Sequence, residues 1–366
     1  MKNILLYIFV IGMIFLGGCS QNEELPQGKE ERSNLVEFDI FFTRDDPAVP
    51  KEDPEKYFKT GESIVLISQA IGTSEKGIDF SENSENCYKY VYNGNTEATW
   101  DEGFNFESID PISWERVRLN GQYGNGFAFA ALFFPRDYKE VYEIPSDQRD
   151  ENVFIESDVL GAWHTTGSFG ERLRFRMYHL MCMVKINLYV PVFDEEQGNG
   201  IDPDEVIATA INFNTSYKFL FNDRITDLPL ILNATGDVAA DIYMHQTEDP
   251  ELIDNFDVSF FDQPDMDTDK VRKYSFQVLF PYQTKIGDLF RFTLTRGDMT
   301  YNYLFKNSKD TSTSGDLSFE QGYINHLELY LPRTDNDIVL FRATLKDWNV
   351  ANASFTITEE ITEETD

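Results

Sequence analysis

Cysteine is scarce in this chain, with three residues among 366: Cys19, Cys87 and Cys182. So few cysteines exclude the dense disulfide framework on which small secreted folds depend. Cys87 and Cys182 could form one bond in an oxidising compartment, or remain two thiols that pack as small hydrophobes. We favour the thiols, because Cys182 lies inside an apolar strand pattern.

Signatures of catalysis and of metal binding are also missing. The chain has no Gly-x-Ser-x-Gly, no Ser-x-x-Lys in a helical setting and no glycine-rich phosphate loop. Its four histidines are scattered without the paired spacing of metal ligands. The acidic run 265–269 begins like a calcium loop, but Lys270 and Phe276 stand where glycine and glutamate are required. The sequence therefore predicts no catalytic residue, no metal centre, no cofactor and no enzyme. A weak surface calcium site and, more remotely, an unrecognised hydrolase site stay open.

Positive charge is in short supply. The chain has 31 Lys and Arg residues against 64 Asp and Glu, which gives a formal net charge of −33. Residues 1–18 contain one lysine and no acidic residue, so the chain without them carries −34. A surface this acidic repels nucleic acid and anionic membrane faces. We therefore exclude nucleic acid as a partner.

The chain begins with an apolar run that is too short to be a membrane anchor. Ile4–Leu16 is shorter than the roughly 20 residues that a membrane-spanning helix needs. Lys2 precedes the run, and Leu16-Gly17-Gly18-Cys19 ends it in the manner of a bacterial lipobox. In that kind of signal the cysteine is acylated and becomes the first residue. We expect a signal peptide at 1–18, a lipid such as palmitate on Cys19 and a polar tether at 19–33. A plain signal peptide with an incidental Cys19 is the alternative.

The residues after Cys19 bear on where the protein is delivered. Ser20 follows the cysteine where aspartate would indicate retention in the inner membrane, and Glu23 and Glu24 come soon after it. This short acidic stretch resembles surface-export signals of some Gram-negative bacteria. We expect a lipid-anchored, surface-exposed protein of the outer membrane.

Period-two alternation dominates the rest of the chain. Val36, Phe38, Ile40 and Phe42 alternate with Glu37, Asp39 and Phe41, as in a half-buried strand. Further strands are predicted at 63–68, 88–92, 127–134, 173–177, 180–190, 206–213, 217–221, 228–232, 237–244, 273–280, 289–295, 300–305, 323–331 and 338–345. The pattern falls out of step at 178–179, which predicts a bulge or corner there. Helical periodicity is scarce: 251–256 could form one turn, and 113–119 is ambiguous.

Many short strands separated by turn residues predict an all-β fold of sandwiches with little helix. A chain of this length exceeds what one core usually supports, so we expect two domains. A polar loop after Pro191 is the predicted boundary. The expected organisation is an N-terminal β-sandwich at 34–195, a C-terminal β-sandwich at 196–350 and a tail at 351–366.

Several segments together resemble one known group, the fimbrillin-like lipoproteins, which include the type V pilins. Each motif is loose, and their order along residues 34–350 together with the lipobox carries the resemblance. The matching segments are Phe58-Lys59-Thr60-Gly61-Glu62-Ser63-Ile64, Phe127-Ala128-Phe129-Ala130-Ala131-Leu132-Phe133-Phe134-Pro135, Leu173-Arg174-Phe175-Arg176-Met177-Tyr178-His179-Leu180-Met181-Cys182-Met183-Val184, Gly322-Tyr323-Ile324-Asn325 and Leu345-Lys346-Asp347-Trp348. Two departures are that tyrosine is displaced after Gly322 and that Leu345 stands where isoleucine is usual.

The resemblance implies two tandem transthyretin-like β-sandwiches with Greek-key-type connections. It also implies a surface adhesin or pilus subunit, with other pilin-like subunits or a surface receptor as partners. In polymerising members an arginine-specific protease removes the first strand, and a strand of the next subunit fills the groove. The matching cleavage site is Arg44, with Arg32 as the runner-up, and the exchanged strand would be Val36, Phe38, Ile40 and Phe42. The alternative is that this strand is a permanent edge of the sheet.

The resemblance leaves two further points open. In stalk pilins C-terminal strands serve as the donor, and in this chain Phe355 and Ile357 are the candidate anchors. The alternative function is a surface glycan-binding lipoprotein that never polymerises. Its sugar-stacking residues would be drawn from Trp100, Trp114, Trp163 and Trp348, although tryptophans in sandwich cores more often serve packing.

Overall fold

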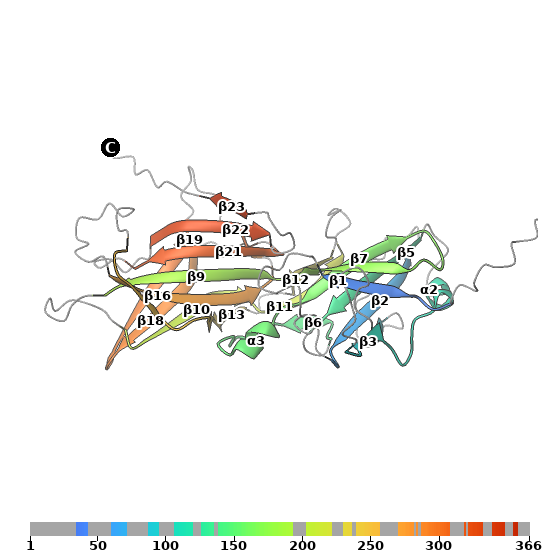
Figure 1. The fold of residues 1–366 in the computed structure, drawn as a ribbon, viewed down its shortest axis with the longest axis horizontal. Coiled ribbons are helices and arrows are strands. Elements are labelled where there is room, and N and C mark those ends of the chain that lie inside the picture. The colour runs from blue at the N-terminus through green and yellow to red at the C-terminus, as the bar shows by residue number, and fades with distance from the viewer. Residues whose placement is uncertain are drawn as a thin grey trace, which may run out of the picture. The chain divides into compact units, whose positions relative to one another are not determined.

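The structure is a computed structural model of the whole chain (Figure 1). It describes residues 34–42, 60–71, 87–94, 106–119, 126–134, 138–192, 203–221, 230–235, 239–256, 270–281, 283–284, 287–307, 318–319, 321–331, 339–347 and 354–357. Strands predominate in the described residues, which contain two short helices, α2 (Trp114–Leu119) and α3 (Glu151–Ile155). The all-β prediction is confirmed.

The first sheet has seven strands in the order β1-β8-β7-β5-β2-β3-β4. Its strands are β1 (Phe38–Phe42), β2 (Ser63–Ile71), β3 (Cys87–Tyr92), β4 (Phe106–Glu107), β5 (Gly126–Phe133), β7 (Leu160–Thr166) and β8 (Leu173–His179). Strand β8 pairs with β7 over two residues only, Leu160↔His179 and Gly161↔Tyr178, but it pairs with β1 over five. The β1-β8 pair therefore turns away from the main sheet at this corner.

The turned-away pair covers an apolar core of its own. Leu173, Phe175 and Met177 of β8 belong to one cluster with buried residues of the other strands. That cluster also contains Ile64, Leu66, Tyr88, Tyr90, Tyr92, Phe129, Ala131 and Phe133. Strands β1 and β8 thus form the second layer of a sandwich whose first layer is the rest of the sheet.

A second seven-stranded sheet has the order β14-β16-β9-β21-β22-β23, with β15 pairing on β16. Its strands β16, β9, β21, β22 and β23 lie side by side in Figure 1. Its strands are β9 (Cys182–Pro191), β14 (His245–Gln246), β15 (Glu251–Ile253), β16 (Val271–Phe280), β21 (Tyr323–Tyr330), β22 (Val339–Asp347) and β23 (Ser354–Ile357). A four-stranded sheet, β13-β10-β18-β19, comprises β10 (Glu205–Asn214), β13 (Ala239–Tyr243), β18 (Gly287–Arg296) and β19 (Met299–Asn307).

These two sheets share one large core. The ring of Phe213 on β10 lies 4.5 Å from the ring of Phe280 on β16, and Phe276 lies 6.1 Å from Phe292 on β18, between centroids. Two smaller sheets complete the described residues. They are β12-β11-β6 and β17-β20, built from β6 (Val141–Glu143), β11 (Ser216–Phe221), β12 (Leu230–Ala234), β17 (Gln283–Thr284) and β20 (Ser318–Phe319).

Two local predictions need comment. The predicted corner is present, because β8 ends at His179 and β9 starts at Cys182 in a different sheet. The suggestion of a helical turn at 251–256 is wrong, because β15 pairs antiparallel with β16 at Glu251↔Lys273. A segment this short has no decisive periodicity, so its partner strand decides its conformation.

The chain divides into two units, Met1–Asn34 and Leu35–Asp366, and all the strands belong to the second. Strand β9 precedes the predicted boundary at 195/196, yet it pairs with β16 and β21 from beyond it. Two domains divided at that point remain a prediction.

Candidate functional site

The predicted site residues fall partly inside the described structure. Cys19, Arg32 and Arg44 lie outside the described residues. Val36, Phe38, Ile40 and Phe42 lie on or beside β1, and for Phe42 the structure describes the backbone. Phe355 and Ile357 lie on β23, where again only the backbone is described.

Strand β1 pairs with a strand far away in sequence. It lies parallel to β8, with Phe38 opposite Leu173, Ile40 opposite Phe175 and Phe42 opposite Met177. The Leu173 amide donates to the Glu37 carbonyl at 2.9 Å. Strand β1 is the terminal strand of its sheet, so this parallel ladder is its main attachment.

A second attachment holds the residues just before β1. The Val36 amide donates to the Ile112 carbonyl at 3.0 Å, and Leu35 forms an isolated antiparallel bridge with Ser113. The Ile112 amide in turn donates to the Tyr90 hydroxyl at 3.0 Å. The residues just before β1 are therefore bound to the segment that leads into α2, and β1 itself is bound to β8 along all five of its residues.

One face of β1 enters the core of the first sandwich. Val36 is 5% exposed and Ile40 is fully buried. Phe38 is half-buried and packs edge-on against two rings, with centroids 4.8 Å from Tyr90 and 5.9 Å from Phe175. The alternation read from the sequence therefore describes the buried face, with Phe38 less covered than its neighbours.

The other face of β1 carries a buried charge that the sequence did not single out. Asp39 is only 8% exposed, and its carboxylate accepts two hydrogen bonds from the Arg172 guanidinium: Nη2 to Oδ1 at 2.6 Å and Nε to Oδ2 at 2.8 Å. Arg172 Nη1 also lies 3.4 Å from Glu37 Oε2. These hydrogen bonds raise the pKa of Arg172 above its ordinary value, and a bidentate pair of this kind fixes orientation as well as energy.

The outer face of β8 continues the positive charge. Arg174, opposite Asp39, and Arg176, opposite Phe41, are both exposed. The Arg174 guanidinium lies over the Phe41 ring, 6.0 Å from its centroid. Arginines at alternate positions share one face of a strand. The sequence contains arginine at three alternate positions, Arg172, Arg174 and Arg176, and acidic residues at two alternate positions, Glu37 and Asp39. Only the parallel register of β1 and β8 shows that the two groups lie side by side.

The C-terminal candidate, β23, is paired in this structure. It runs antiparallel to β22 from Ser354↔Lys346 to Ile357↔Ala343 and ends the order of the second seven-stranded sheet. Its backbone is thus that of an edge strand paired within its own chain.

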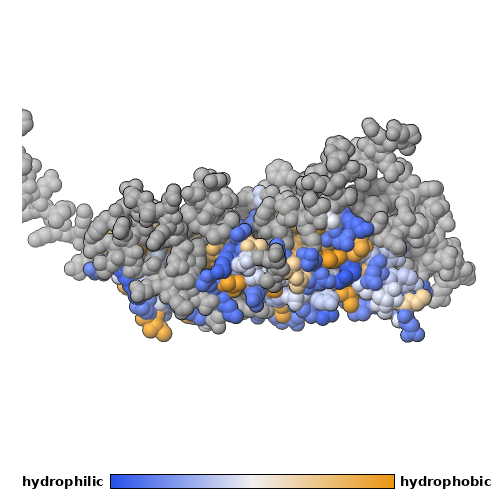
Figure 2. All heavy atoms as spheres, turned by 180° about the vertical axis from the view of Figure 1, so that it is seen from behind, coloured by the Kyte–Doolittle hydropathy of each residue, from blue (hydrophilic) through white to orange (hydrophobic). Residues whose placement is uncertain are grey.

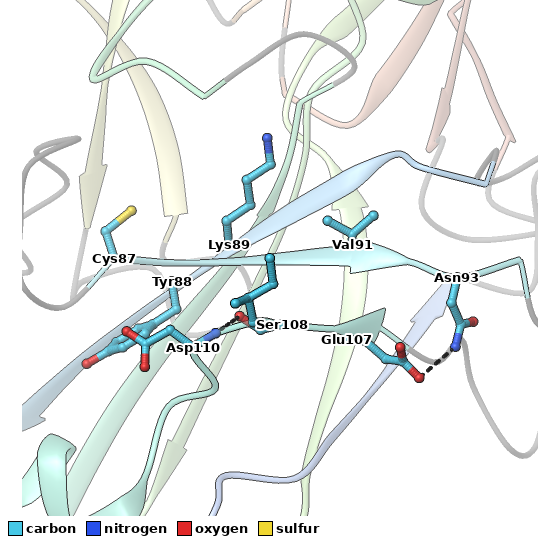
Figure 3. Close-up of a pocket in the computed structure, with 9 residues that line it drawn as sticks. Cys87, Tyr88, Lys89, Val91, Asn93, Glu107, Ser108 and Asp110 are labelled. Carbon is cyan, nitrogen blue, oxygen red and sulfur yellow. Dashed lines mark hydrogen bonds between the residues drawn. The ribbon is translucent and has the colours of Figure 1, made fainter.

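An open pocket of about 590 Å³ lies beside β3 and β4 (Figure 3). The alternate residues Cys87, Lys89 and Val91 of β3 line it, and Ile109 contributes a fully exposed side chain. Within it the Asn93 side-chain amide donates to Glu107 Oε1 at 3.0 Å. Its chemistry is a mixed apolar and charged surface.

Cys87, Cys182 and His179 lie within the described residues. Cys87 and Cys182 are both thiols with no disulfide between them, which is the favoured interpretation. His179 Nδ1 lies 2.8 Å from Asp158 Oδ2 at the corner after β8. The described residues hold no cluster of His, Cys, Asp and Glu able to bind a metal, and the acidic run 265–269 lies outside them. None of the helices in the described segments is long and apolar enough to cross a membrane.

His326 shares one face of β21 with Glu328 and Tyr330, and 39% of its side chain is exposed. Its neighbours on that face are buried: Glu328 is 9% exposed and Tyr330 is 2% exposed. Glu328 accepts from the Tyr189 hydroxyl at 2.6 Å and from the Asn187 side-chain amide at 3.1 Å. Phe256 covers this face by stacking on Tyr189, which the alternation of a single strand could not reveal.

Two of the four tryptophans that the glycan alternative needs lie within the described residues. Trp114 is 1% exposed and packs against Phe129, so it belongs to the core. Trp163 is half-buried beside the large core, and Trp100 and Trp348 lie outside the described residues. Figure 2 shows the described part of one face, where polar residues predominate and apolar ones are scattered. The two tryptophans that the structure describes do not form a sugar platform.

No protein-family profile and no curated protein matches this chain. Solved structures with a similar fold include a candidate cell adhesion protein from Bacteroides uniformis, at 13% identity over 86% of this chain and 99% of that one, with a TM-score of 0.47. A fimbrial protein from Bacteroides ovatus is similar at 12% identity over 81% of this chain and 48% of that one, with a TM-score of 0.34. A fimbrial assembly protein from Parabacteroides distasonis is similar at 8% identity over 88% and 99%, with a TM-score of 0.40.

Proposed function

We propose that this chain is a non-enzymatic lipoprotein of the outer-membrane surface, anchored through Cys19, that serves as an adhesin or fimbrial subunit and assembles by exchange of its first strand. The observation that carries this proposal is the way in which β1 is held. The groove that β1 fills, bounded by the backbone edge of β8 and by the side chains of Leu173 and Phe175, is called here the seat of β1. A terminal strand, joined to the rest of its sheet along a single parallel ladder, completes an apolar core.

Burial explains why the seat of β1 would not stay empty. Val36, Phe38 and Ile40 each contribute up to about 1.5–3 kcal/mol by leaving water, so together they stabilise the seated strand by at most about 4.5–9 kcal/mol. If β1 left, the apolar side chains of Leu173, Phe175 and the core beneath would be exposed together with the backbone edge of β8. An extended segment with the same alternation satisfies both requirements, which is β-strand addition.

Arg44 supports the proposal by its position. Strand β1 ends at Phe42, and Arg44 comes two residues later, so a cut after Arg44 would separate β1 from β2 without dividing either strand. A cut after Arg32 would leave β1 attached. After the first cut the lipid and the first strand would depart together, whereas after the second cut the lipid would depart and the first strand would stay with the sandwich.

Arginine-specific digestion of the folded protein tests strand exchange. We expect a new N-terminus at Asp45 and, on incubation, ladders of oligomers that resist SDS. Arg44→Gln should prevent both results, and Arg32→Gln should prevent neither. A protein cut cleanly after Arg44 that stays monomeric would show that strand exchange is wrong.

The anchor is tested separately. Mass spectrometry of the mature protein from whole cells should find acylated Cys19 as the first residue, and Cys19→Ser should abolish the lipid mass and surface retention. A mature N-terminus that lacks acyl groups would refute the anchor and leave strand exchange untouched.

A further inference from the structure

We propose that Arg172 selects which strand occupies the seat of β1, by requiring a carboxylate at the position that Asp39 now holds. The inference rests on the proposed strand exchange and adds the chemistry of the partner. That partner is an extended segment, parallel to β8, with apolar residues at the positions of Val36, Phe38 and Ile40 and an acidic residue at the position of Asp39.

The geometry of the pair makes it a selective contact. Arg172 directly precedes β8, and its guanidinium uses two separate nitrogens on the two oxygens of Asp39. Asp39 is nearly buried, with 11% of its side chain exposed, whereas 58% of the Arg172 side chain is exposed. A planar guanidinium recognises a carboxylate bidentately, and an amide or hydroxyl at that point would lose one charged acceptor.

The surrounding charges also favour an acidic residue at the position of Asp39. Arg174 lies opposite Asp39 in the register, so a cation at that position of an incoming strand would face both arginines. Glu37 adds a weaker contact to Arg172 at 3.4 Å. In a chain with about twice as many acidic as basic residues, this is a local basic site that favours an acidic strand and disfavours a basic one.

The C-terminal segment of this chain does not meet the requirement. Placing Ala353, Phe355 and Ile357 at the positions of Val36, Phe38 and Ile40 puts Thr356 at the position of Asp39. Moving the segment by two residues supplies Thr358 there and places Glu359 on the apolar face. The apolar alternation is therefore present without the carboxylate, so this C-terminal segment would fill the seat less tightly than a strand with an acidic residue at the position of Asp39.

Peptide competition measures the selection. The full chain is cut after Arg44 in its folded state, so that β1 remains seated, and is then incubated with labelled peptides. A peptide of residues 34–43 should bind about fivefold to tenfold more tightly than the same peptide with Asp39→Asn. A peptide of residues 352–361 should gain a similar factor from Thr356→Asp. Both differences should vanish in an Arg172→Gln protein and persist in an Arg176→Gln protein.

The outcomes separate the two proposals. If no peptide enters the seat, strand exchange fails and the selection fails with it. If the Asp and Asn peptides bind equally, Arg172 does not select and strand exchange stands. The uncut chain gives an independent measurement: Asp39→Asn should speed amide exchange in Phe38–Phe42 about fivefold to tenfold, and should add nothing in an Arg172→Gln background. Additive effects of the two substitutions would overturn the inference.

Discussion

Replacing Ile40 with alanine should loosen β1 alone and leave the other seven-stranded sheet unchanged. Ile40 is fully buried among the residues of the first core and lies opposite Phe175 of β8. Isoleucine-to-alanine changes at buried sites cost about 2–5 kcal/mol, made up of lost burial and a residual cavity. A terminal strand can relax more readily than a central one, so we expect the lower part of that range, about 2–3 kcal/mol.

Native-state amide exchange resolves where this cost is felt. A loss of about 2–3 kcal/mol corresponds to amide exchange in Phe38–Phe42 that is roughly 30- to 150-fold faster, because 1.4 kcal/mol is a factor of ten. Amides of β16, which belong to the other seven-stranded sheet, should exchange at their original rate. Phe41→Ala on the outer face of β1 is the matched control, and it should change the rate by less than about tenfold.

Two results would refute the reasoning. If the amides of β1 and β16 accelerated equally, β1 would open only when the whole chain unfolds, and it would not be a separable strand. If the amides of β1 did not accelerate, its burial would not hold it in place. Either result would also remove the physical basis of strand exchange.

Three further predictions follow from other contacts. Gln148 is fully buried, and its side chain both donates to and accepts from the Leu279 backbone, at 2.8 and 3.0 Å. Gln148→Leu should therefore lower the free energy of unfolding, measured by urea titration, by about 2–4 kcal/mol. Gln246→Leu on the exposed surface is the control and should change it by less than about 0.5 kcal/mol. Burial raises the pKa of Tyr90 to about 12, above the ordinary value of 10.0. Its contribution to the free energy of unfolding is therefore complete below pH 10 and declines as the pH rises to about 12. Tyr90→Phe should remove this part of the decline in stability, and an unchanged dependence of stability on pH would contradict the prediction. Cys87 is half-buried and Cys182 fully buried, so a thiol reagent should modify one cysteine in the folded protein and both in denaturant, and a disulfide found by mass spectrometry would be contrary to this.

The strands with strong alternation were predictable from the sequence because each has one buried face. β9 and β16 match the predicted ranges to within a few residues. β7 was not predicted, since Gly161, Ala162 and the threonines give it no regular apolar period, although β5 pairs with all of it. Its conformation is imposed by a neighbour, which single-strand periodicity does not report.

The seat of β1 was predictable only in part. The alternation of apolar residues along β1 predicts its apolar face from the sequence of that strand alone. The parallel partner β8 is more than 130 residues away, as the Arg172–Asp39 contact shows, and no local signal specifies such a pairing. Asp39 was assigned to the outer face correctly, but its burial depends on Arg172 and could not be inferred before the register was known.

The same arginines bear on what an empty seat would be like. An uncovered strand edge beside an apolar groove is a general template for aggregation, and natural proteins protect such edges with charged side chains. Arg174 and Arg176 are exposed on the outer face of β8, and Arg172 would lose its carboxylate partner once β1 departed. Strands without acidic residues would leave this cation unpaired, and basic strands would be repelled by it. A groove that is strongly apolar on one side and basic at its rim therefore combines a large driving force for strand addition with discrimination among strands, which a purely apolar groove would lack.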